Sequence, residues 1–143
     1  MKEELEKIEL SWDLPHPPGK VWRALTEPEL VAQWLMSNDL KLQVGHRFTF
    51  KTEPAPWWDG IVNSEIIEIE SGRRLVYTWG TSGPKEGLDS RVIWTLTAIE
   101  IGTRLALEHT GFKPGNKFAY EGAKKGWDRN VAERMSNVLV SLI

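Results

Sequence analysis

The side chains of this sequence that could take part in chemistry are three histidines and an excess of aromatic rings. The 143-residue chain holds eight tryptophans and no cysteine. Without cysteine, disulfides, thiolate metal sites, iron–sulfur clusters and cysteine nucleophiles are all excluded. The sequence also has no glycine-rich phosphate loop, no H-E-x-x-H zinc motif and no G-x-S-x-G nucleophile motif. We therefore assign no catalytic residue from a motif and turn to the histidines and the indoles.

His109 is the histidine best placed for a functional role. It follows Leu105 and Leu107 at a spacing of two, so the three side chains should share the inner face of one strand. An imidazole on an apolar wall could orient a polar ligand group or act as a general base. We favour the alternative of a core histidine that is hydrogen-bonded to the backbone. Because His16, His46 and His109 lack the spacing of metal ligands, we expect no metal site and no cofactor.

Three indoles are expected to converge in the interior. Trp79 and Trp94 lie on alternating strand patterns, and Trp127 lies on the apolar stripe of a predicted helix. An aromatic pocket with few polar groups is typical of small-molecule sites, but a solid aromatic core would give the same pattern. Trp22 and Trp34, in contrast, are expected to pin two short helices to the sheet. The full set of predicted ligand-binding residues is Phe50, Trp58, Tyr77, Trp79, Trp94, His109 and Trp127.

Trp57 and Trp58 form an adjacent pair in a loop that contains Pro54 and Pro56 and ends at Gly60. Adjacent indoles point in different directions, so one can turn inward while the other is exposed. We favour Trp58 as the inward one. An exposed indole would serve as a pocket lid, as a contact with a chaperone, or as a contact in a homodimer.

The carboxylates give a weaker indication of function. Glu65, Glu68 and Glu70 share one predicted strand, and Glu53 and Asp59 flank the aromatic loop. A glycosidase pair requires two carboxylates that face each other across a cleft, which spacing alone cannot show. We expect most of these groups to be solvated charges at the edge of a sheet.

The elements that position these residues begin with a strand over residues 8–14, where apolar and polar residues alternate. A first short helix is expected around Val21–Leu25, and a second begins at Pro28 and continues through Trp34. Six further strands are expected at Leu40–Val44, Phe48–Phe50, Gly60–Glu70, Leu75–Trp79, Val92–Ala98 and Leu105–His109. In the strand over 60–70 the apolar phase shifts, as a β-bulge near Glu65 would produce.

The last element is one long amphipathic helix, with its apolar stripe running from Tyr120 to Leu142. The order is therefore strand, two short helices, six strands and a long helix. This order predicts a single α+β domain over residues 1–143, in which about six to seven antiparallel strands need a helical cover on their apolar face. The long helix is the element of sufficient length to provide it.

Composition and charge exclude several classes of partner. The formal net charge of −2 and the isoelectric point near 5.9 leave no basic field for nucleic acid. No apolar run approaches the roughly 20 residues that a membrane-spanning helix requires. The acidic start, Met1–Glu6, does not resemble a signal peptide. We expect a soluble cytoplasmic protein that binds neither nucleic acid nor membrane.

Several ordered stretches carry a family resemblance: Val21–Glu29 with Gln33-Trp34, Asp59-Gly60, Arg74–Trp79, Thr103–Phe112 and Gly126-Trp127. This pattern resembles the START-like (SRPBCC) superfamily, which includes polyketide cyclases and birch-pollen-allergen-like proteins. More narrowly, it is similar to the branch named for the activator of heat-shock protein 90 ATPase. The resemblance implies a helix-grip fold, in which a curved antiparallel sheet wraps a long C-terminal helix and often leaves a cavity between them.

The sequence departs from these relatives at three places: Trp34-Leu35, Val44–His46 and Ser71–Arg73. Relatives often have two adjacent tryptophans at the first place, a Gly-Gly turn at the second and a proline turn at the third. Because the first change falls near the expected cavity mouth, the identity of a ligand cannot be carried over from any relative.

Three hypotheses for function follow. The first is a binding protein that holds a small apolar or aromatic molecule in an internal cavity. The second is a co-chaperone-like module that binds another protein, which the family name suggests. The third is a cyclase or hydrolase in which His109 acts as the base. We rank the enzyme below the binding protein because no second catalytic group is recognisable.

Overall fold

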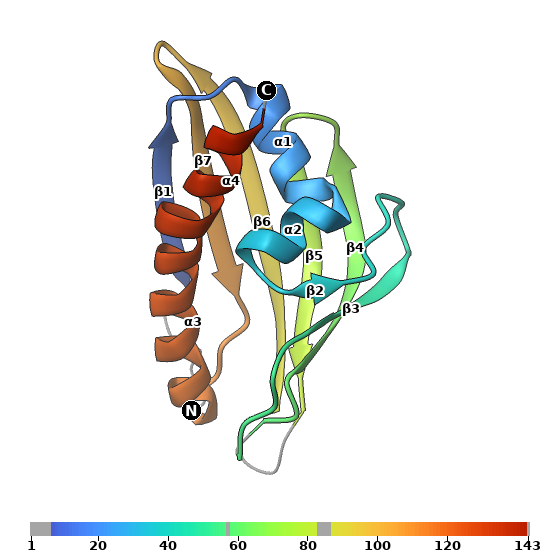
Figure 1. Ribbon diagram of the computed structural model, residues 1–143. Coiled ribbons are helices and arrows are strands. Elements are labelled where there is room, and N and C mark those ends of the chain that lie inside the picture. The colour runs from blue at the N-terminus through green and yellow to red at the C-terminus, as the bar shows by residue number, and fades with distance from the viewer. Residues whose placement is uncertain (1–6, 57, 83–86, 143) are drawn as a thin grey trace.

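The computed structural model describes residues 7–56, 58–82 and 87–142 (Figure 1). The predicted α+β helix-grip architecture is confirmed. In the described residues, seven antiparallel strands form one curled sheet in the order β1-β7-β6-β5-β4-β3-β2. The strands are β1 (Ile8–Leu14), β2 (Ser37–Asn38), β3 (Arg47–Lys51), β4 (Ile61–Glu70), β5 (Arg74–Thr81), β6 (Leu88–Ile99) and β7 (Gly102–Thr110).

The helices all pack on one face of this sheet (Figure 1). Two short helices, α1 (Pro18–Thr26) and α2 (Pro28–Trp34), follow β1, as expected. Each begins with proline in its first turn, where the missing N–H group removes no helical hydrogen bond. The first strand pairs with the last, from Ile8 opposite His109 to Leu14 opposite Thr103, and this pairing brings β1 beside the C-terminal helix.

The long C-terminal helix is continuous over residues 114–141 but is not uniform. A short 3-10 turn at Pro114–Asn116 leads into α3 (Lys117–Arg129), a π-helical turn follows at Asn130–Met135, and α4 (Ser136–Ser141) ends the run. The two halves are buried to different extents. Trp127 is the one buried residue of α3, whereas the π-helical turn and α4 bury Val131, Met135, Val138 and Leu139. The second half therefore anchors the helix, and α3 stands over a less tightly packed part of the sheet.

The strand predicted at residues 40–44 is wrong. The structure has the two-residue β2 just before it, and Leu42 and Val44 are 41% and 59% exposed in a loop. Polar side chains replace the expected ladder. Asn38 Oδ1 accepts a hydrogen bond from the Leu40 backbone N–H, and Asp39 Oδ1 accepts one from the Thr49 backbone N–H at 2.7 Å. Because these side chains satisfy the backbone, the chain leaves the sheet after two residues.

The bulge predicted near Glu65 is confirmed, with its register shift between Ile66 and Glu68. The three carboxylates of β4 are exposed or half-buried and form ion pairs with neighbouring arginines at Arg47, Arg73 and Arg74. They are surface charges, as expected, and none faces the interior. In the part of the chain that the structure describes, no helix combines the length and apolarity that crossing a membrane requires.

Candidate functional site

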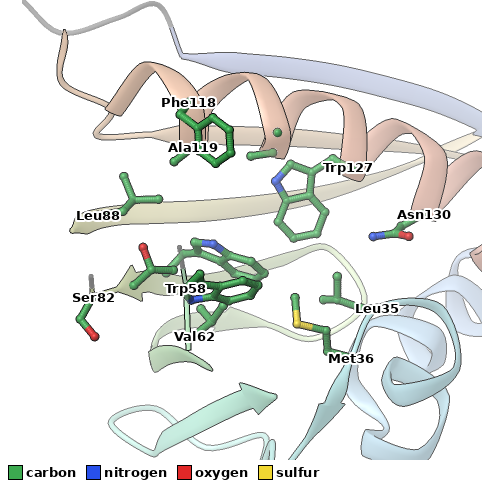
Figure 2. A pocket seen from close by; sticks show the side chains of 15 residues that line it. Leu35, Met36, Trp58, Val62, Ser82, Leu88, Phe118, Ala119, Trp127 and Asn130 are labelled. Atoms are coloured by element: carbon green, nitrogen blue, oxygen red, sulfur yellow. The ribbon is translucent and has the colours of Figure 1, made fainter. Parts of the chain in front are cut away.

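A cavity of about 260 Å³ lies between the sheet and α3 (Figure 2). Its walls come from the end of α2, the start of β4, the end of β5, the start of β6 and one face of α3. None of the described lining residues carries a charge. They are Leu35, Met36, Trp58, Val62, Trp79, Thr81, Ser82, Leu88, Phe118, Ala119, Gly122, Ala123, Gly126, Trp127 and Asn130.

Three indoles and the more exposed ring of Phe118 form the aromatic part of the lining. The rings of Trp79 and Trp127 lie with their centroids 5.0 Å apart and tilted by 57°. Trp58 is half-buried, and its Nε1 donates a hydrogen bond to the backbone oxygen of Ile61 at 3.0 Å. Trp127 Nε1 is also engaged, whereas Trp79 Nε1 donates to no group among the described residues. A ligand would therefore contact mainly the ring carbons of Trp58 and Trp127, because their N–H groups are already bonded.

Trp127 is held by a directional chain of hydrogen bonds behind the cavity. Its Nε1 donates to His109 Nδ1 at 3.0 Å. Because an indole N–H can only donate, His109 Nδ1 must accept, and the histidine proton is on Nε2. That Nε2 lies 2.8 Å from Ser90 Oγ, and the Ser90 hydroxyl donates to the backbone oxygen of Trp79 at 2.7 Å. The direction of each hydrogen bond from Trp127 through His109 and Ser90 to the Trp79 backbone is therefore fixed.

His109 is therefore a neutral core residue. It is fully buried, and burial lowers its pKa to about 3. The interpretation as a core histidine agrees with this placement, but its partners are the side chains of Ser90 and Trp127 rather than the backbone. His109 does not line the cavity, and its free lone pair is occupied by the Trp127 N–H. The structure thus gives no support to His109 as a general base.

Three other predicted ligand-binding residues lie in the packed core beside the cavity. Phe50, Tyr77 and Trp94 are nearly or completely buried and do not line the cavity. Trp94 Nε1 donates to the Tyr77 hydroxyl at 3.0 Å, and Trp34 packs edge-on against Trp94 with ring centroids 5.9 Å apart. Burial also raises the pKa of Tyr77. A solid aromatic core therefore fills this half of the interior.

Of the seven predicted ligand-binding residues, three line the cavity: Trp58, Trp79 and Trp127. Trp58 has its indole toward the cavity (Figure 2), whereas Trp57 lies outside the described residues. The predicted contact of this pair with a chaperone or a second copy remains a prediction.

The helix side of the cavity was not predicted from the sequence. Ala119, Gly122, Ala123 and Gly126 follow the i, i+3, i+4, i+7 spacing of one helix face on α3, and all four line the cavity. A Cβ atom added at Gly122 or Gly126 would meet no atom within 4 Å. The space exists because these side chains are small or absent. Part of the signal was present in the sequence, since Ala123 lies on the apolar stripe that was predicted to point inward.

Comparisons with known proteins place this architecture in a family. The family model for activator of Hsp90 ATPase homolog 1-like proteins matches residues 15–139. The solved structure of protein MLL2253 from Mesorhizobium loti is 38% identical, with a TM-score of 0.89, and covers 96% of this chain and 99% of its own. A comparison with curated proteins gave no match.

Two more solved structures share 26% identity with this chain. Protein BH1534 from Bacillus halodurans has a TM-score of 0.76, with 97% of this chain and 99% of its own covered. DynU16, from the dynemicin biosynthetic locus, has a TM-score of 0.78, with 96% of this chain and 48% of its own covered.

Proposed function

We propose that this chain, which belongs to the family of activator of Hsp90 ATPase homolog 1-like proteins, binds a small, uncharged and mainly aromatic molecule between its sheet and α3. The observation that carries the proposal is the pairing of opposite walls. Indoles on the sheet side, Trp58 and Trp79, face a helix surface that has no side chains at Gly122 and Gly126. A flat ring fits between such walls and contacts the indole faces.

The volume sets the size of the ligand. Ligand pockets commonly measure about 300–1,000 Å³, so a cavity of about 260 Å³ lies at the small end of the range. One ring or two fused rings match this space. A larger molecule would require α3 to move away from the sheet, and Trp127 would then leave the hydrogen bond that holds it.

The lining also sets the charge of the ligand. None of its described residues is charged, so a carboxylate or ammonium group brought into the cavity would lose water without gaining a counter-ion. Contacts with the indole faces add about 0.5–1.5 kcal/mol for each well-oriented aromatic pair. Neutral aromatic molecules should therefore bind better than charged analogues of the same shape.

The test is an NMR titration of isotope-labelled protein with naphthalene, which follows the indole N–H signals. The signals of Trp79 and Trp127 should shift in the wild type. The Gly126→Leu variant, whose new side chain occupies the cavity, should not respond. The control is Lys125→Leu, which places the same side chain at an exposed position on α3 and should bind normally. Equal binding by wild type and Gly126→Leu would show that naphthalene binds elsewhere and would contradict the proposal.

A further inference from the structure

We propose that Asn130 determines specificity in this cavity, by selecting an aromatic ligand that carries an uncharged oxygen substituent such as a phenolic hydroxyl or a ketone. This inference rests on the proposed function. Its starting point is the position of Asn130 at one end of the cavity, beside Leu35 and Trp127, with Ser82 and Leu88 at the other end (Figure 2).

The helix places this amide on the cavity wall. Asn130 follows Gly126 by four residues and Trp127 by three, so all three share one helix face. It is also the first residue of the π-helical turn, and such turns occur frequently at functional sites. The side chain is half-buried, so it contacts the cavity without being sealed in the core.

The amide of Asn130 has no hydrogen-bond partner among the residues that the structure describes. Most other polar groups of the lining are already used or exposed. The N–H groups of Trp58 and Trp127 are bonded within the protein, Thr81 has a partner, and Ser82 is exposed at the far end. Asn130 is a half-buried lining residue whose amide can both donate to and accept from a molecule in the cavity.

When a ligand fills the cavity, the Asn130 amide favours ligands that can hydrogen-bond to it over pure hydrocarbons. A pure hydrocarbon would displace water from Asn130 without replacing its hydrogen bonds, and such an unsatisfied group is costly. A hydroxyl or carbonyl oxygen at the same end of the ligand would satisfy it. The Trp79 N–H, which also lacks a described partner, favours an oxygen acceptor as well. A carboxylate is disfavoured because no described lining residue supplies a positive charge.

The experiment compares three ligands of one shape: naphthalene, 2-naphthol and 2-naphthoate. Dissociation constants come from NMR titrations of the wild type, of Asn130→Leu and of Ser82→Ala. Leucine has nearly the shape of asparagine without its polar atoms, and Ser82→Ala is the control for a polar group at the opposite end.

The wild type should bind 2-naphthol about 3- to 10-fold more tightly than naphthalene, the effect of about one net hydrogen bond. It should bind 2-naphthoate more weakly than either. In Asn130→Leu the preference for 2-naphthol should disappear while naphthalene still binds, and in Ser82→Ala it should persist. Naphthalene binding also reports that each variant is folded.

Two results overturn the inference and can be told apart. If naphthalene binds but the preference for 2-naphthol is absent from the wild type or survives in Asn130→Leu, only the role of Asn130 fails. If none of the three ligands binds to the wild type, the proposed function fails and the inference fails with it.

Discussion

The buried His109 should make the stability of the protein depend on pH in a defined window. Its pKa is about 3 in the folded protein and 6.5 in an unfolded chain, and burial is the cause. Above pH 6.5 the imidazole is neutral in both the folded and the unfolded state, so His109 does not reduce the free energy of unfolding. As the pH falls below 6.5, the unfolded chain takes up a proton that the folded protein does not, and stability is lost progressively down to about pH 3.

The magnitude follows from the size of the shift. Each pH unit inside this window removes up to about 1.4 kcal/mol from the free energy of unfolding. A change from pH 7 to pH 5 should therefore remove about 2 kcal/mol, out of a total of roughly 5–15 kcal/mol for an ordinary domain. Asp13 does not interfere, because its pKa is lowered from 3.8 by Arg104 and its contribution is lost only at more acidic pH.

Urea denaturation at pH 7 and pH 5 measures this loss, with His109→Gln as the matched variant. Glutamine can accept from Trp127 and donate to Ser90 but does not titrate. His16 also has a lowered pKa, from burial and from Lys20, and contributes to the loss in both proteins. The difference between wild type and variant isolates His109. If both proteins lose the same free energy of unfolding, the imidazole is not held neutral and the directional hydrogen-bond chain is wrong.

Two substitutions, one in the cavity wall and one in the packed core, should have opposite effects on the free energy of unfolding. Gly126→Ala should raise the free energy of unfolding by about 1 kcal/mol, because alanine favours the helix and its Cβ meets no atom within 4 Å, yet it should weaken naphthalene binding. Gly102→Ala is the control that must destabilise, since φ is +153° there and a Cβ would overlap the backbone of Leu14. Trp94→Ala should cost about 3–5 kcal/mol of stability in the same urea assay, because this buried ring packs against Trp34; a loss below about 1 kcal/mol would contradict the packed core.

The periodicity of the sequence was sufficient to orient the strands. Alternation placed Tyr77, Trp94 and His109 on the inner face, and the structure buries all three. It failed at Leu42 and Val44, which alternate in the sequence but lie exposed in a loop. Alternation records which side chains share a face. It does not record whether the backbone on that segment is bonded by a strand or by nearby side chains such as Asp39.

The distribution of space inside the protein could not be predicted from the aromatic residues alone. Trp79 and Trp94 have the same residue type and face the same interior, yet Trp79 lines the cavity and Trp94 does not. The difference lies in what stands opposite. Trp34 fills the space beside Trp94, whereas Gly122 and Gly126 leave it open near Trp79. A cavity is therefore indicated by small residues on the facing element, and these were not part of the aromatic pattern.

Trp127 marks the boundary between the packed and open parts of the interior. Its ring meets Trp94 edge-on at 5.4 Å on the core side and lies 5.0 Å from Trp79 on the cavity side. An indole at such a boundary could turn toward the open space and fill it. The hydrogen bond from its Nε1 to His109 opposes this rotation, because a rotated ring would leave a buried imidazole nitrogen without a partner. His109 therefore contributes to the cavity without lining it: by accepting from Trp127, it keeps the volume beside Gly126 open.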